Sequence, residues 1–153
     1  MSVNVSDIQI GNHLDGVTKT LDQDKMDRFE KVGRILITEG EETEEPTNIH
    51  TDPEKAKAMG LDRPIASGQM SYSYFHELMC RQFGIDFRQG GSLSVTFLKP
   101  VYAGDTVSAH GLVEGKDEVE GRTTLTVNVW LENQGGEKTS TGQASVTIPS
   151  PRT

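Results

Sequence analysis

One histidine in the sequence is placed where it could move a proton on a bound molecule. His50 lies in the stretch Asn-Ile-His-Thr-Asp-Pro at 48–53, and an apolar helical segment begins at Ser67-Gly68. An imidazole exchanges a proton near neutral pH, and the first N–H groups of a helix stabilise negative charge on oxygen. Together the two features would make a small acid–base site. The alternative for His50 is a loop histidine that bridges the neighbouring turn.

Two short helices are predicted on either side of an acidic loop. A capping-box spacing followed by apolar residues at helical intervals predicts a helix at about 22–32, ended by Gly33. Residues 34–38 are β-prone. Residues 39–45 contain five glutamates, whose mutual repulsion favours a solvated loop. The second helix is expected at roughly 53–59.

A longer helix and a run of strands complete the predicted fold. The segment 67–83 is apolar around most of its circumference, so we expect a helix that is wrapped by a sheet and ends at Gly84. Residues 1–20 suggest an edge strand or an extended arm. Alternation of apolar and polar residues then predicts four strands joined as hairpins in an antiparallel meander, around 93–97, 107–113, 125–131 and 144–148. This order predicts an α+β fold, with the whole chain, 1–153, as a single domain.

Composition restricts the function classes. The net charge of -8, from 15 Lys and Arg against 23 Asp and Glu, argues against a nucleic-acid or membrane-surface partner. The single cysteine, Cys80, is expected to fill the core, and we see neither a secretory signal nor a membrane-spanning apolar run, so a cytoplasmic location is expected. Hydrophobic residues at 33% fit a protein that buries further apolar surface by associating. No phosphate loop, nucleophile elbow or metal-ligand spacing is present, so neither a cofactor nor a metal is expected.

Three segments in order carry a family resemblance. The stretches 48–53, 63–70 and 97–105 resemble the MaoC-like (R)-specific enoyl-CoA hydratase and dehydratase family of the hot-dog fold. The resemblance implies an antiparallel sheet wrapped around a long central helix at about 67–83. It also implies a homo-oligomer with a dimer as its minimum unit. The implied substrate is an acyl thioester, carried on coenzyme A or an acyl carrier.

The resemblance also suggests roles for single residues. The usual motif of the family is Gly-Asp-x-Asn-Pro-x-His, and counting back from His50 places Glu45 at the aspartate position. The usual His-Gly at the start of the central helix is Ser67-Gly68 here. By this resemblance His50 and Glu45 are the catalytic proton-transfer pair, and the Gly68 N–H contacts the thioester carbonyl. Asn48 and Ser67 are candidate substrate-binding residues.

Each of these residues also has a purely structural interpretation. Glu45 is one of five loop glutamates that solvent alone would explain, and Asn48 fits turn chemistry. Asp52 is a competing carboxylate, but its position before a proline favours an N-cap. Ser67 is expected to cap the long helix rather than to bind substrate. Gly68 would permit close packing at the helix start.

The function predicted from these observations is a hydratase or dehydratase acting on an α,β-unsaturated acyl thioester. One alternative is another reaction at an activated carbonyl, such as thioester hydrolysis, isomerisation or a biosynthetic tailoring step. The other alternative is a non-catalytic acyl-binding subunit. Arg63, Arg88 and Lys99 are candidates for contacting ligand phosphates, although each is also an ordinary surface cation. Tyr72 and Tyr74 are expected to be core aromatics.

Overall fold

The structure, a computed structural model, describes residues 7–37 and 47–149, and for residues 34–37 it describes the backbone alone. Helices and strands alternate little along the chain, which confirms the α+β prediction. Their order is β1 (His13–Thr20), α1 (Gln23–Ile37), α2 (Pro53–Ala58), α3 (Gly68–Gly90), β2 (Ser92–Phe97), β3 (Thr106–Val119), β4 (Arg122–Glu132) and β5 (Lys138–Pro149). None of these helices is long and apolar enough to cross a membrane.

The strands form one antiparallel sheet in the order β1-β3-β4-β5-β2. The predicted meander is correct for β3, β4 and β5, which are neighbours both in sequence and in space. It is wrong for β2, which pairs with β5 rather than with β3. Because β1 and β4 occupy both edges of β3, β2 cannot pair with β3, and it lies instead at the outer edge of β5. The segment 100–105 is therefore a crossover connection and not a hairpin.

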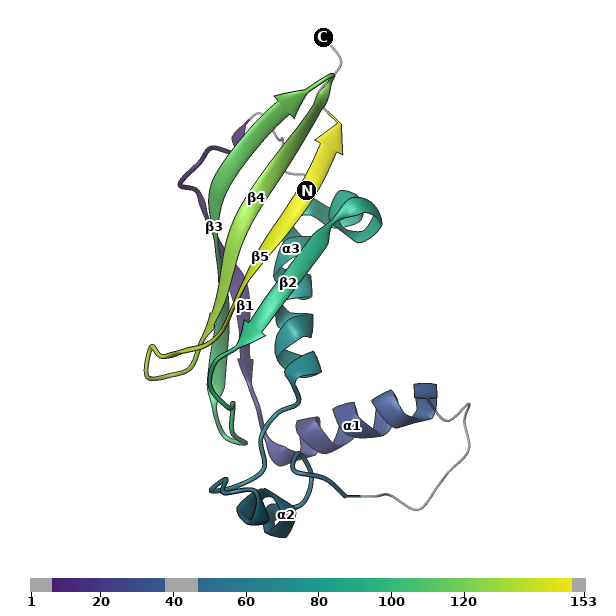
Figure 1. Cartoon of the computed structure of the whole chain (residues 1–153), viewed down its shortest axis with the longest axis vertical. Coiled ribbons are helices and arrows are strands. Elements are labelled where there is room, and N and C mark those ends of the chain that lie inside the picture. The colour runs from purple at the N-terminus through teal and green to yellow at the C-terminus, as the bar shows by residue number, and fades with distance from the viewer. Residues whose placement is uncertain (1–6, 38–46, 150–153) are drawn as a thin grey trace.

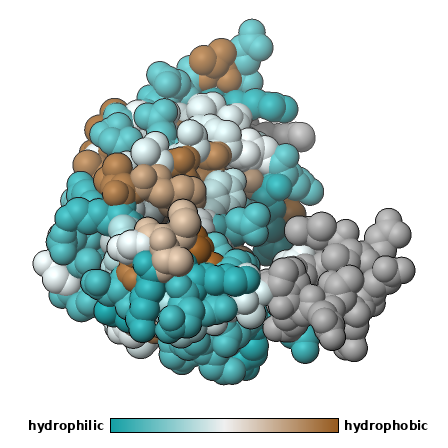
Figure 2. All heavy atoms as spheres, turned by 60° about the horizontal axis from the view of Figure 1, so that its bottom comes forward, coloured by the Kyte–Doolittle hydropathy of each residue, from teal (hydrophilic) through white to brown (hydrophobic). Residues whose placement is uncertain are grey.

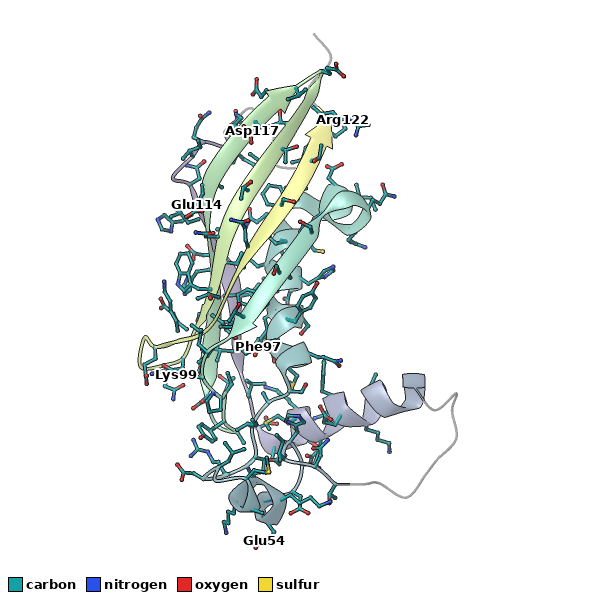
Figure 3. The ribbon with its side chains drawn as sticks, in the orientation of Figure 1. Glu54, Phe97, Lys99, Glu114, Asp117 and Arg122 are labelled. Atoms are coloured by element: carbon teal, nitrogen blue, oxygen red, sulfur yellow. The ribbon has the colours of Figure 1, made fainter. Side chains whose placement is uncertain are left out.

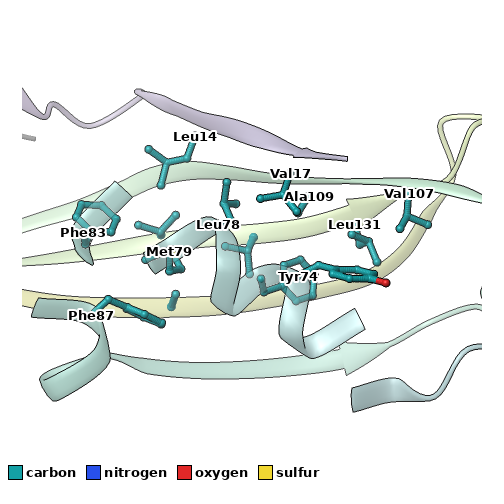
Figure 4. Packing of buried hydrophobic residues seen from close by; sticks show 14 of the residues in the cluster. Leu14, Val17, Tyr74, Leu78, Met79, Phe83, Phe87, Val107, Ala109 and Leu131 are labelled. Atoms are coloured by element: carbon teal, nitrogen blue, oxygen red, sulfur yellow. The ribbon is translucent and has the colours of Figure 1, made fainter. Parts of the chain in front are cut away.

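The core lies between α3 and the inner face of the sheet, which curves along one side of this helix (Figure 1). Leu78 and Met79 of α3 have no exposed surface and face alternate residues of β1, β3 and β4 (Figure 4). Those strand residues include Leu14, Val17, Val107, Ala109 and Leu131. The central helix wrapped by a sheet is confirmed. Tyr72 departs from the prediction because it is 41% exposed on the far side of α3.

The central helix extends past its predicted end. Gly84 leaves helical geometry, with φ 55° and ψ -125°, but the chain resumes helical geometry and continues to Gly90. Glycine adopts such a positive φ without the steric cost that a side chain would bring. The kink turns the last part of α3 so that Phe87 is buried against the core. Gly84 therefore bends the helix rather than ending it.

Small hydroxyl side chains recur on the outer face of the sheet, among larger polar and aromatic ones such as His110 and Trp130. In β3 and β4, buried residues alternate with partly exposed ones over most of their length. Pairs of hydroxyls lie 2.7–2.9 Å apart across neighbouring strands: Thr18 with Ser108, Thr20 with Thr106, Ser92 with Ser145, and Thr124 with Thr147. Such cross-strand pairs stabilise a sheet without apolar cover.

Helices α1 and α2 lie beyond the end of the sheet, next to the first turn of α3 (Figure 1). Helix α1 does not end at Gly33, as predicted, but continues to Ile37, so the β-prone residues 34–37 are helical. A glycine ends a helix by adopting positive φ, and Gly33 does not do so. The short helix α2 ends at Ala58, close to its predicted end.

Candidate active site

His50 is fixed at its backbone and at its ring. Its N–H donates to Asn48 Oδ1 at 2.8 Å, and Gln23 Nε2 donates to its carbonyl oxygen at 2.8 Å. Its ring Nδ1 lies 2.8 Å from the carbonyl oxygen of Ile65. A carbonyl oxygen only accepts hydrogen bonds, so Nδ1 carries the proton and Nε2 is the acceptor in the neutral ring. The fold thus prepares His50 to take up a proton at Nε2.

His50 lines two cavities. One, of about 380 Å³, has mostly polar residues around it: Glu30, Asn48, Ser67 and Gln69, together with Phe29 and Gly33. The other, of about 410 Å³, is bordered mainly by apolar residues, including Leu61, Ile65, Phe97, Leu98 and Val101. Seen from the end of the molecule that carries α1 and α2, apolar residues gather beside a hollow that hydrophilic residues border on the other side (Figure 2). His50 therefore has a polar and an apolar neighbourhood.

Ser67 has a buried hydroxyl that forms no hydrogen bond with the described residues. The residue occupies the N-cap position of α3, but its side chain makes no capping hydrogen bond, so the expected capping role is wrong. Its Oγ is buried and has no hydrogen-bond partner among the described residues, and the residue is 9% exposed. Leaving such a group unsatisfied costs about 1–3 kcal/mol. A bound polar group in the cavity shared with His50 would remove this cost.

Gly68 begins α3 and is packed against an aromatic ring. A Cβ at this position would lie 2.9 Å from two ring atoms of Phe97, so the close-packing interpretation is confirmed. Phe97 ends β2 at the level of the first turns of α3 and is 54% exposed (Figure 3). The backbone N–H groups at a helix start have no partner within the helix. Close packing and an oxyanion contact from Gly68 are therefore compatible.

Asn48 links the His50 segment to α1. Its Oδ1 accepts the His50 N–H, and its Nδ2 donates to Glu30 Oε2 at 3.1 Å. Both ends of the amide are engaged, which fixes the loop, and the residue also lines the polar cavity. Contact of Asn48 with substrate remains a prediction.

Sequence reasoning missed Glu30, a partly buried carboxylate in the polar cavity. Helix α1 presents it: Met26 is fully buried, and Glu30 lies one turn further along the same helix face. Spacing from Met26 was the available signal. Glu45, the carboxylate that the family motif suggests, lies outside the described residues.

Asp52 has the structural role expected from its position before a proline. Its carboxylate accepts from the backbone N–H groups of Glu54 and Lys55 and caps α2. The Thr47 hydroxyl donates to it at 2.9 Å, and this bond is the main reason that the pKa of Asp52 lies below its ordinary value. Asp52 is thus committed to the helix start and not to His50.

The basic candidates already have protein partners or lie at the surface. Arg63 donates to the carbonyl oxygen of Ala103 at 3.0 Å and lies over the Tyr102 ring. Lys99, beside the apolar cavity, forms an ion pair with Glu137. Arg88 is exposed in the last turn of α3. Contact of these side chains with ligand phosphates stays a prediction.

Other reactive side chains lie away from this site. Burial raises the pKa of Tyr74 to about 12, so it stays protonated at neutral pH. Cys80 packs partly against the core, as expected, with its Sγ 3.5 Å from Nδ1 of His76. No cluster of His, Cys, Asp or Glu that could hold a metal ion occurs in the described ranges 7–37 and 47–149.

Comparison with known proteins identifies relatives that are similar in sequence and in fold. The chain is 33% identical over 101 residues to an (R)-specific enoyl-CoA hydratase of Aeromonas caviae, covering 66% of this chain and 74% of the hydratase. The structure of an (R)-hydratase from A. caviae involved in PHA biosynthesis superimposes with a TM-score of 0.71 at 25% identity, covering 95% of this chain and 100% of that one. A monoamine oxidase regulatory protein from Archaeoglobus fulgidus gives a TM-score of 0.74 at 25% identity, covering 99% and 97%.

The fold shared with these structures is the hot-dog fold, an antiparallel sheet around a long helix. A model of the MaoC-like domain matches residues 43–135, more than half of the 153-residue chain. That range contains His50, Ser67 and Gly68. The chain therefore belongs to the MaoC-like domain family, which includes (R)-specific enoyl-CoA hydratases.

Proposed function

We propose that this protein adds water to, or removes it from, an α,β-unsaturated acyl thioester. The observation that carries the proposal is the state of His50. Its Nδ1–H is held by the Ile65 carbonyl, so Nε2 accepts a proton in a cavity that also contains the unpartnered hydroxyl of Ser67. The activity named for the A. caviae relative supports this chemistry.

In the hydration direction, His50 Nε2 takes a proton from water as the water oxygen bonds to Cβ of the substrate. The electron pair of the C=C bond moves toward the thioester oxygen, and the Gly68 N–H and the helix start stabilise the charge there. The imidazolium then returns its proton to Cα, which completes the addition and restores neutral His50. Ser67 Oγ binds a polar atom of the substrate.

The apolar cavity gives the acyl group a place beside the catalytic base. Its border includes the side chains of Leu61, Phe97 and Leu98, and burial of a methylene group there is worth about 0.8 kcal/mol. Coenzyme A and an acyl carrier are the two thioester carriers that this proposal allows.

The exposed edge of the sheet supports a homo-oligomer. At the end of the sheet, β2 pairs with β5 on one side and with no strand of the described ranges on the other. Phe97 and Leu98 are both more than half exposed beside this edge. Unpaired N–H and C=O groups flanked by apolar side chains favour association through this strand. We propose a dimer as the oligomeric unit and the cytoplasm as its location.

Replacing His50 with alanine tests the function directly. We expect kcat for hydration of a crotonyl thioester to fall about 1,000-fold, because the acceptor for the water proton is lost. Loss of the conjugated enoyl absorbance measures the rate, and circular dichroism checks the fold. His76→Ala is the matched control, since His76 is exposed on α3 and lines neither of the two cavities that His50 lines.

Product analysis separates the alternatives. A 3-hydroxyacyl thioester as product supports the proposal. Release of free thiol would instead identify a thioesterase, and tight binding of the enoyl thioester without turnover would identify an acyl-binding subunit. Equal turnover by wild type and His50→Ala would remove His50 from the mechanism.

A further inference from the structure

We infer that Glu30 is the second catalytic residue of the site and holds the water molecule that His50 deprotonates. This inference rests on the proposed function and adds a residue from α1, an element that precedes the range matched by the family model. Glu30 contacts a reactant, the water, rather than acting through another side chain.

One face of α1 is turned toward the His50 segment. Met26 is fully buried, and Gln23 and Glu30 lie three residues before it and four residues after it, so all three share a helix face. Gln23 reaches the His50 carbonyl oxygen, and Glu30 reaches the Asn48 amide. Two hydrogen bonds from the same face of α1 therefore fix the position of Glu30 relative to His50.

Glu30 lies at the polar cavity and not at the protein surface as its neighbours do. Asp24 and Asp27, on the same helix, are exposed, whereas Glu30 is partly buried. Among the described residues that line this cavity, Glu30 is the only carboxylate. The cavity is therefore lined by the base His50, the carboxylate of Glu30 and the Ser67 hydroxyl, which has no hydrogen-bond partner among the described residues.

A second acceptor would orient the attacking water. A water molecule has two O–H groups, and His50 offers one acceptor atom, Nε2. Asn48 binds Oε2 of Glu30, and the other oxygen, Oε1, accepts the second O–H. Holding both O–H groups turns a lone pair of the water oxygen toward Cβ. Glu30 accepts this hydrogen bond and takes up no proton, while one proton passes from water to His50 and then to Cα.

Glu30→Gln distinguishes this role from simple support of Asn48. The amide oxygen of glutamine can still accept from Asn48, which places an NH₂ donor where the water needs an acceptor. We expect kcat for crotonyl thioester hydration to fall about 100-fold, with KM changed less than about twofold. Glu54→Gln is the matched control, because Glu54 is exposed on α2 at the outer end of the molecule (Figure 3).

Glu30→Asp provides a second measurement in case the glutamine variant folds poorly. It keeps the charge but withdraws the carboxylate by one methylene, and we expect kcat to fall about tenfold. Wild-type kcat in a folded Glu30→Gln or Glu30→Asp variant, together with inactive His50→Ala, overturns the role of Glu30 and leaves the proposed function standing. A wild-type protein that hydrates no enoyl thioester overturns both.

Discussion

Between α3 and the sheet, elements meet through fully buried aliphatic and aromatic side chains. At the other end of the molecule, α1, α2 and the His50 segment meet mainly through hydrogen bonds of single polar side chains, such as Gln23 to His50 and Asn48 to Glu30. Apolar burial is worth more free energy per residue than a net hydrogen bond, which contributes about 1 kcal/mol. Stability and site geometry should therefore respond to different substitutions.

The largest effect on stability is expected in the core. Leu78 has no exposed surface and packs between α3 and the sheet. Leu78→Ala should lower the free energy of unfolding by about 3 kcal/mol, because it removes apolar contacts and leaves a cavity. Urea denaturation followed by circular dichroism measures the change.

Met59→Ala is the matched control for this substitution, since Met59 follows α2 in the site region and is 70% exposed. We expect it to change the free energy of unfolding by less than about 0.5 kcal/mol. Equal losses for the two variants would contradict the division between a core that supplies stability and a site region that does not.

A smaller effect, on activity rather than on stability, is expected at the start of α3. The methyl group of Gly68→Ala would press on the Phe97 ring, which is exposed enough to swing aside. We expect kcat/KM to fall about tenfold, because the methyl and the displaced ring crowd the proposed oxyanion contact. Steady-state kinetics at matched protein folding, checked by thermal melting, measures it.

Adding Phe97→Ala to Gly68→Ala makes room for the methyl group. If crowding is the cause, the double variant should recover most of the loss relative to Phe97→Ala alone. Absence of any recovery would show that the Phe97 ring has no part in the effect.

The smallest effect is expected at Asp52, in the site region. Thr47→Val removes the hydroxyl that lowers the pKa of Asp52. A carboxyl whose pKa is lowered by folding stabilises the fold above its unfolded-state pKa, and this contribution disappears as pH falls through its folded-state pKa. The variant should therefore be less stable than wild type at neutral pH and equal to it in strong acid. A difference independent of pH would assign the effect to something other than the Asp52 charge.

Alternation and helical periodicity predicted most of the fold. The strands β3 and β4 bury every second residue over most of their length, β5 does so over its second half, and α3 buries the face that packs on the sheet, so local pattern and tertiary packing agree. The pairing of β2 with β5 depends on which sheet edges remain available, and a local pattern carries no such information. Gly33 and Gly84 were misjudged because a glycine ends a helix only where the backbone adopts and keeps a non-helical geometry.

The site was predictable only where chemistry and position coincide in one short segment. His50, Ser67 and Gly68 were found from residue type and helix context, and the structure brings them together at the start of α3. Glu30 was missed because its place at the cavity depends on how α1 packs through Met26. The missing hydrogen bond of the Ser67 hydroxyl likewise depends on the three-dimensional environment, since a serine before a helix normally caps it.

The hydroxyl pairs on the outer face of the sheet offer an explanation for the low hydrophobic content of the chain other than association. A sheet that is covered by a helix on one face only must make its other face wettable, and paired serines and threonines do this without charge. About half of the strand residues are therefore excluded from the core by geometry. The mean hydropathy of -0.50 is in keeping with a sheet whose outer face is polar, and it does not by itself require a hidden apolar surface.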